Sequence, residues 1–106
     1  MTGALAASSG TASLPGYTFS GDTDTGIYRS AADSIGIVTG GATRLQVLPL
    51  GNVGIGTVAP GASFHIQSNW AGSMLLDGDF DNNDTSDQNT TIFLRQNAGT
   101  VMGFIG

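Results

Sequence analysis

Residues 43–67 read TRLQVLPLGNVGIGTVAPGASFHIQ, and this stretch decides the class of fold. Apolar and polar residues alternate in Thr43–Leu48 and again in Ser63–Gln67. A period of two residues is typical of β-strands with one face in a core and the other in water. The glycine-rich run 51–60 lies between the two segments. It predicts a place where the backbone bends between two strands.

The run 51–60 also contains Gly54-Ile55-Gly56-Thr57-Val58-Ala59, which fits the G-x-G-x-x-G/A fingerprint of a dinucleotide-binding turn. That turn needs a helix immediately after it, because the helix N-terminus faces the phosphates. The residue before Pro60 favours extended geometry, and Gly61 is a poor helix former. We therefore predict no cofactor. The residues assigned a structural role in the turn are Gly51, Gly54, Gly56 and Pro60.

The composition predicts an all-β protein. The 106 residues include 17 glycines, no cysteine, no lysine and no glutamate, so the usual helix formers of a protein surface are scarce. Short β-type runs alternate with turn residues, a spacing that indicates a protein rich in hairpins. The predicted strands are Tyr17–Phe19, Gly26–Arg29, Ser34–Thr39, Thr43–Leu48, Val53–Ile55, Ser63–Gln67, Met74–Leu76, Thr90–Arg95 and Val101–Ile105.

The charge and the apolar pattern exclude two classes of partner. The formal net charge is −5, and the three arginines are scattered, whereas phosphate contacts need clustered basic residues. No run of about 18 apolar residues occurs, so we predict no membrane insertion and no nucleic-acid binding. Small residues dominate 1–16, which we interpret as an extended or flexible N-terminal arm. Residues 17–106 are predicted to form a single β-rich domain.

Tyr17–Ile66 carries a resemblance to a known family. Its motifs are SGDTDTGIY at Ser20–Tyr28, GGATRL at Gly40–Leu45 and GNVGIGTVAP at Gly51–Pro60. This segment resembles one that recurs in tail fibres, tailspikes and related virion proteins of tailed bacteriophages. The resemblance implies an intertwined homotrimer, like a β-prism or triple β-helix, that serves as a rigid shaft, knob or adaptor in host attachment or virion assembly. It implies other virion proteins as partners, a place in the virion and no enzymatic activity.

Assembly is also indicated by the small number of apolar residues. A chain of this length with so much glycine encloses little hydrophobic core, and it has no cysteine to form a disulfide. Oligomerisation is then the common remaining means of stabilisation. Three chains wound together would bury the apolar residues of the recurring strands, so residues 17–106 are predicted to trimerise. The candidates for the trimer core are Phe19, Ile27, Ile35, Ile37, Leu45, Val47, Val53, Ile55, Phe64 and Ile66.

Two other functions stay open at this point. The first is a trimeric knob or cement protein that decorates a capsid surface, for which the same trimeric β-rich fold is expected. A glycan-binding adhesin module is the alternative from another class, because Trp70 could stack on a sugar of the bacterial surface. Packing of Trp70 at a trimer interface is the competing interpretation.

The remaining chemical motifs are incomplete, so no catalytic or metal site is predicted. Asp24-Thr25-Gly26 is the triplet of aspartic proteases, but it follows polar turn sequence rather than a buried strand. His65 is the only histidine; three copies in a trimer could converge on a metal ion. The Asp-rich stretch Asp77–Asn89 lacks the glycine and glutamate of an EF-hand loop, so we expect a solvated loop there.

Overall fold

The computed structural model describes residues 3–76, 92, 95–96 and 100–101, and within them the protein is all-β with no helix. This confirms the predicted all-β class. The chain divides into two units, residues 1–73 and 74–106. The first unit holds one open sheet of six strands, and the second holds a two-stranded ribbon. No helix in the described part of the chain is long and apolar enough to cross a membrane.

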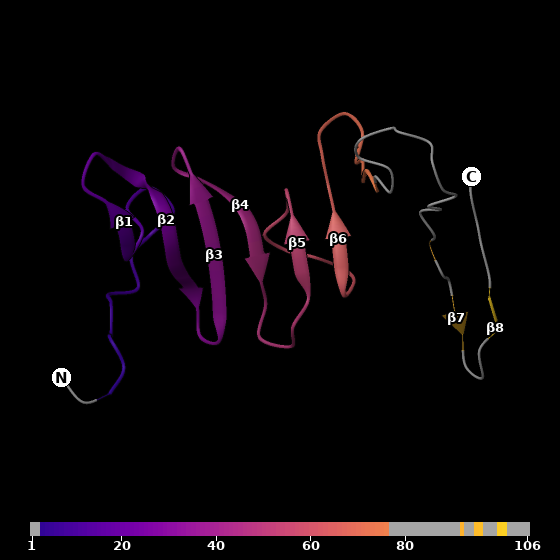
Figure 1. Cartoon of the computed structure of the whole chain (residues 1–106), viewed down its shortest axis with the longest axis horizontal. Helices are drawn as coiled ribbons and strands as arrows, with labels where there is room; N and C mark the ends of the chain where they lie inside the picture. The colour runs from indigo at the N-terminus through magenta and orange to yellow at the C-terminus, as the bar shows by residue number, and fades with distance from the viewer. Residues whose placement is uncertain (1–2, 77–91, 93–94, 97–99, 102–106) are drawn as a thin grey trace, which may run out of the picture. The chain divides into compact units, whose positions relative to one another are not determined.

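The six strands of the first unit lie side by side in their sequence order (Figure 1). They are β1 (Tyr17–Phe19), β2 (Asp22–Ala31), β3 (Ser34–Thr39), β4 (Ala42–Val47), β5 (Val53–Ile55) and β6 (Phe64–Ile66). In the second unit β7 (Arg95–Gln96) pairs antiparallel with β8 (Thr100–Val101).

All six strands predicted between residues 17 and 67 are confirmed in position, three of them with the predicted bounds. The interpretation of the residues before Asp24 as polar turn sequence is wrong for Asp22 and Thr23, because β2 already begins at Asp22. Threonine favours strands, and the Thr18 hydroxyl donates to the carbonyl oxygens of Asp22 (3.0 Å) and Thr25 (2.8 Å), which holds β1 against β2. The strand predicted at Met74–Leu76 does not form.

Some predictions fall outside the described residues. They are the Asp-rich stretch Asp77–Asn89 and most of the two predicted strands Thr90–Arg95 and Val101–Ile105.

The strands β1 to β5 form an antiparallel meander, whereas β5 and β6 are parallel. The connection between β5 and β6 is residues 56–63, and it passes over one face of the sheet above Gly54. A Cβ atom at Gly54 would lie 2.6 Å from the Thr57 carbonyl oxygen and 3.3 Å from Cβ of Pro60. Gly54 therefore allows the connection to approach the sheet closely, and Pro60 within the connection is buried.

The turn between β4 and β5 is closed by two backbone hydrogen bonds. Leu48 N donates to Asn52 O and Gly51 N donates to Leu48 O, both at 2.9 Å. Gly51 has φ of 95°, a conformation that other residues adopt only with strain. Pro49 and the two hydrogen bonds make this turn a stiff projection at one end of the sheet.

The first unit has a thin core on the face crossed by the β5–β6 connection. Val38 is fully buried there, and Gln46 is 3% exposed although it is polar. The ring of Tyr28 covers Gly36, where a side chain would clash with it, and the Tyr28 hydroxyl lies 2.9 Å from Oγ1 of Thr43. We call this side of the sheet the covered face.

Part of the predicted N-terminal arm is attached to the sheet. Arg29 N donates to Ser9 O at 2.9 Å, Gly10 forms an isolated bridge with Pro15, and Pro15 is buried. Residues 3–8 make no strand and are exposed.

Candidate functional site: the exposed apolar face of the sheet

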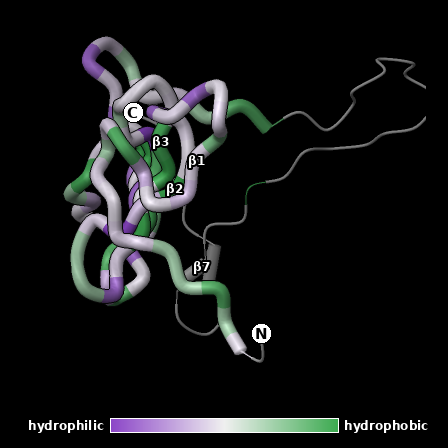
Figure 2. The backbone as a smooth tube through the Cα atoms, turned by 90° about the vertical axis from the view of Figure 1, so that its left-hand side faces the viewer, coloured by the Kyte–Doolittle hydropathy of each residue, from purple (hydrophilic) through white to green (hydrophobic). Residues whose placement is uncertain are grey.

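Cross-strand pairing gathers the apolar residues of the strands on one face. Residues paired across strands lie on the same face of a sheet, as do residues two apart along a strand. The pairing therefore forms two neighbouring rows. The first row is Ile27, Ile37, Leu45, Ile55 and Ile66; the second row is Ile35, Val47, Val53 and Phe64. Figure 2 shows hydrophobic residues along the strands of this sheet.

Two aromatic residues extend the first row onto β1. Tyr17 pairs with Ile27, and the ring of Phe19 meets the ring of Tyr17 edge to face with centroids 6.3 Å apart. All ten predicted trimer-core residues thus lie in the two rows or beside them. Together with Tyr17 they form the apolar face.

No residue of the apolar face is buried within the chain. Four are half-buried, and the side chains of seven are 39–56% exposed. The seven are Tyr17, Phe19, Ile27, Ile35, Ile37, Ile55 and Phe64. At roughly 150–250 Å² for a whole side chain, these fractions leave on the order of 700 Å² of apolar surface. The largest apolar patch of a typical monomer is about 300–600 Å², so this face has the character of an interface.

The alternation predicted a wet polar face, and this part of the prediction is wrong, whereas burial of the apolar face was predicted for three chains wound together and stays a prediction. The polar Gln46 is buried while its neighbours Leu45 and Val47 are only half-buried. The reason is the β5–β6 connection together with the Tyr28 ring, which close the covered face and leave the apolar face open. The sequence pattern shows which residues share a face but not which face the chain itself covers.

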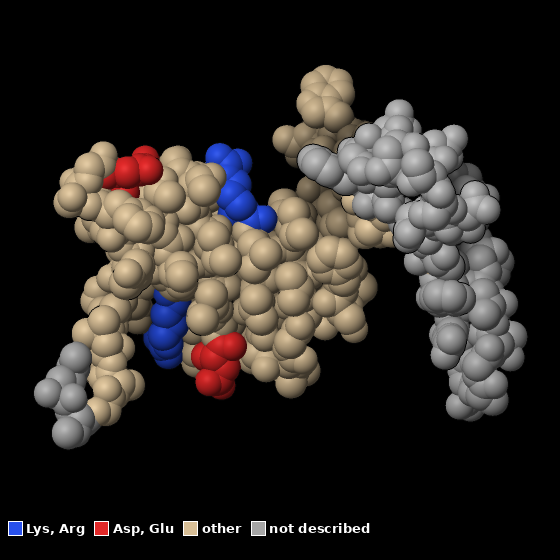
Figure 3. Space-filling view, in the orientation of Figure 1, with Lys and Arg blue, Asp and Glu red and all other residues tan. Residues whose placement is uncertain are grey.

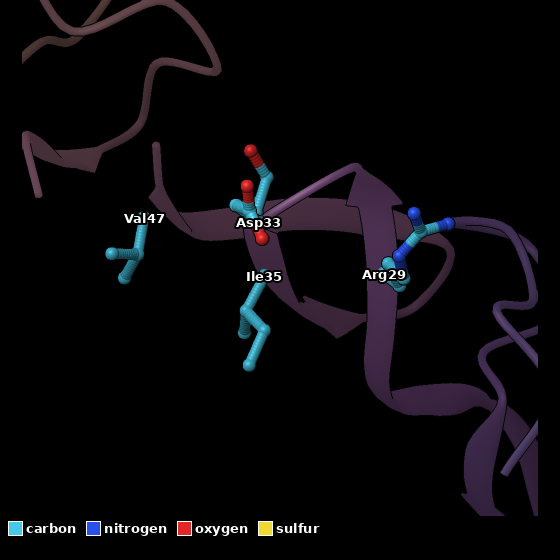
Figure 4. A pocket seen from close by; sticks show the side chains of 5 residues that line it. Arg29, Asp33, Ile35 and Val47 are labelled. Atoms are coloured by element: carbon cyan, nitrogen blue, oxygen red, sulfur yellow. The ribbon is translucent and has the colours of Figure 1, made fainter. Parts of the chain in front are cut away.

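A hollow of about 660 Å³ lies at one end of the second row (Figure 4). Its walls are Ile35 from β3 and Val47 from β4, which are cross-strand partners. Arg29 and Asp33 supply charges beside these walls, and Ser34 completes the lining. The Arg29 guanidinium is only loosely bonded, with Nη1 3.4 Å from Ser9 Oγ. The local sequence carries no signal for this group of residues, because only the turn at Asp33 brings them together.

The glycines of the run 51–60 occupy three different environments. Gly51 closes the β4–β5 turn, and Gly54 lies beneath the β5–β6 connection. Gly56 has φ of 78°, and a Cβ atom there would clash with the Gln67 carbonyl oxygen. The described residues contain no helix after this run, so the arrangement that a dinucleotide-binding turn requires is missing.

His65 lies on the covered face, since it alternates with Phe64 and Ile66 in β6 and pairs with Gly54. Its Nδ1 accepts a hydrogen bond of 3.0 Å from Gly61 N. Three copies that joined their apolar faces would therefore hold His65 on the outside. In such an arrangement the three His65 side chains would not converge on a metal ion. The described residues also hold no group of three metal-binding side chains.

Two candidates remain, the triplet Asp24-Thr25-Gly26 and Trp70. Asp24-Thr25-Gly26 lies within β2, where Asp24 O accepts a hydrogen bond of 2.8 Å from Gly41 N, rather than in the loop of an aspartic protease. Trp70 is 98% exposed and follows β6. On the side of the molecule seen in Figure 3, the charged groups among the described residues are few and separated.

No family model, no curated protein and no solved structure that was compared with the chain matches it. Function is therefore inferred from the sequence motifs and from the geometry of the sheet.

Proposed function

We propose that this chain is a structural protein of a bacteriophage virion, a trimeric shaft or adaptor segment of a tail fibre or tailspike that serves host attachment or virion assembly. The observation that supports the proposal best is the apolar face. The residues that the motif-bearing strands offer for a trimer core lie together on one exposed surface. The protein acts in this proposal by its shape and stiffness, as part of the virion.

The energetics favour a partner that covers this face permanently. Burial of apolar surface stabilises by about 25 cal/mol per Å², so the face corresponds to a gross gain of roughly 18 kcal/mol per copy. A domain is stable by only about 5–15 kcal/mol in total, and association itself opposes part of the gain. Folding of the sheet and assembly are therefore expected to be coupled.

A copy of the same chain is the simplest partner. The exposed side chains are aliphatic and aromatic with few charges, as in obligate interfaces, which resemble a domain core cut in half. Three copies related by a rotation axis bring three such faces together and leave each covered face outside. This arrangement is the β-prism form of the proposed homotrimer.

The proposal is tested on particles of the phage that encodes the chain. Mass spectrometry of purified particles should detect its peptides, and gold-labelled antibodies against the recombinant chain should mark the tail in electron micrographs. Label over the capsid would support the decoration protein instead. Absence of the chain from washed particles, together with binding to bacterial-surface polysaccharide, would support the glycan-binding module.

A further inference from the structure

We propose that the hollow at the end of the second row receives Leu50 from a neighbouring copy, so that the β4–β5 turn locks one chain onto the next. This inference rests on the proposed homotrimer and adds the contact that fixes its register.

Leu50 projects as a preformed knob. Its side chain is 97% exposed, so it fills no hollow of its own chain. The turn that carries it is held by the two hydrogen bonds between Leu48, Gly51 and Asn52 and by Pro49. Little conformational entropy is then lost when Leu50 enters a partner, and such pre-organisation favours binding.

The hollow suits the tip of such a turn. Ile35 and Val47 give it apolar walls, and its volume of about 660 Å³ admits a leucine with part of its backbone. Peptide carbonyl oxygens of an incoming turn need donors, and the loosely bonded Arg29 guanidinium lies at the hollow. The hollow also continues the second row of the apolar face, which is the surface assigned to assembly.

Position along the sheet distinguishes Leu50 from other exposed apolar residues. Among the described residues, only Leu50 and Trp70 are large apolar side chains more than nine-tenths exposed. Figure 1 shows that the β2–β3 turn and the β4–β5 turn lie at the same end of the sheet. Leu50 lies in the β4–β5 turn, and the hollow is lined by Asp33 of the β2–β3 turn and by Val47 at the end of β4. Trp70 follows β6, which runs parallel to β5, and so comes after the end of the sheet opposite to the β4–β5 turn.

In a trimer with cyclic symmetry, Leu50 can meet the hollow of a neighbouring copy only because both lie at the same end of the sheet. In a cyclic trimer each residue keeps its height along the rotation axis in all three copies, so a knob meets only a hollow at its own height. With the axis along the strands, Leu50 and the hollow lie at the same end of every copy, so in this proposal each of the three copies both donates a knob and receives one.

The test uses the absence of cysteine from the chain. Leu50→Cys and Ile35→Cys are made as separate chains with different tags, unfolded together, refolded and oxidised. A disulfide between the two tags then joins different copies by construction. Leu50→Cys mixed with Val58→Cys is the control, because Val58 is also exposed but lies in the β5–β6 connection over the covered face.

We expect the 35–50 cross-link in the trimer and much less of the 50–58 cross-link. Leu50→Asp should raise the dissociation constant roughly 10- to 100-fold, as loss of a buried leucine does, while Val58→Asp leaves it unchanged. A trimer without the 35–50 cross-link, or with equal cross-linking of both pairs, would contradict the proposed contact between Leu50 and the hollow. The proposed trimer itself would still stand. A wild-type chain that is monomeric by light scattering would overturn both.

Discussion

Gly56 shows how one residue sets the path of the chain between two strands. Its positive φ turns the backbone out of β5, and its missing side chain lets Gln67 pass close after β6. The fingerprint that this glycine shares with nucleotide-binding turns thus has a conformational explanation. Gly54 has a different role two residues earlier, because it gives room to the crossing connection.

Gly56→Ala should destabilise the protein by about 2–4 kcal/mol per chain, since the strain of a left-handed residue adds to the clash with Gln67. Gly61→Ala is the matched control, because a side chain there meets nothing within 4 Å and the backbone is not left-handed. Thermal unfolding of both variants measures the difference. Equal melting temperatures would contradict this account of the turn.

Gly36 is a second residue whose smallness is required. A methyl group there enters the space of the Tyr28 ring, so Gly36→Ala should cost about 1–3 kcal/mol by overpacking. Combining it with Tyr28→Leu should cost less than the sum of the two single changes, because the contact is shared. Chemical denaturation of the three variants gives the coupling, and strict additivity would show that the two positions are independent.

At the scale of strands, alternation was sufficient to predict most of the first sheet. Ser34–Thr39 and Val53–Ile55 were predicted with their observed bounds because their period of two and their flanking glycines act locally. The parallel pairing of β5 with β6 was not predictable in this way. It depends on a short connection that crosses the sheet, and only the folded chain shows that Gly54 makes room for it.

The candidate site was predictable in membership but not in exposure. The ten core candidates share a face because alternate residues along each strand point to the same side and pair with each other across strands. Their apolar residue types make this shared face visible in the sequence. The burial of Gln46 and the hollow beside Ile35 depend on loops folding over one face and leaving the other open. Neither has a signal in the local sequence, so tertiary context overrides the pattern there.

Ile37→Thr tests the apolar face as an element. Threonine keeps the β-branched shape that strands favour but places a hydroxyl in the middle of the first row. We expect assembly to weaken by about 1–2 kcal/mol per copy, because the hydroxyl must be desolvated at the interface. Val58→Thr, a similar change at an exposed site outside the face, should have no effect on sedimentation. If both variants assemble like the wild type, the face is not an interface.

The whole molecule makes the broadest prediction, that folding and association are one transition. Within the part of the chain that the structure describes, the apolar face is open and few large side chains are buried, so the isolated first unit should be marginal in stability. In the trimer, mass action stabilises the folded state as concentration rises. A tenfold increase in concentration should raise the melting temperature by about 5 °C, given the unfolding enthalpy of a domain of this size. Light scattering after size exclusion should give about three times the chain mass of 10.7 kDa. A melting temperature that is independent of concentration, combined with the mass of one chain, would remove the basis for the proposed virion role.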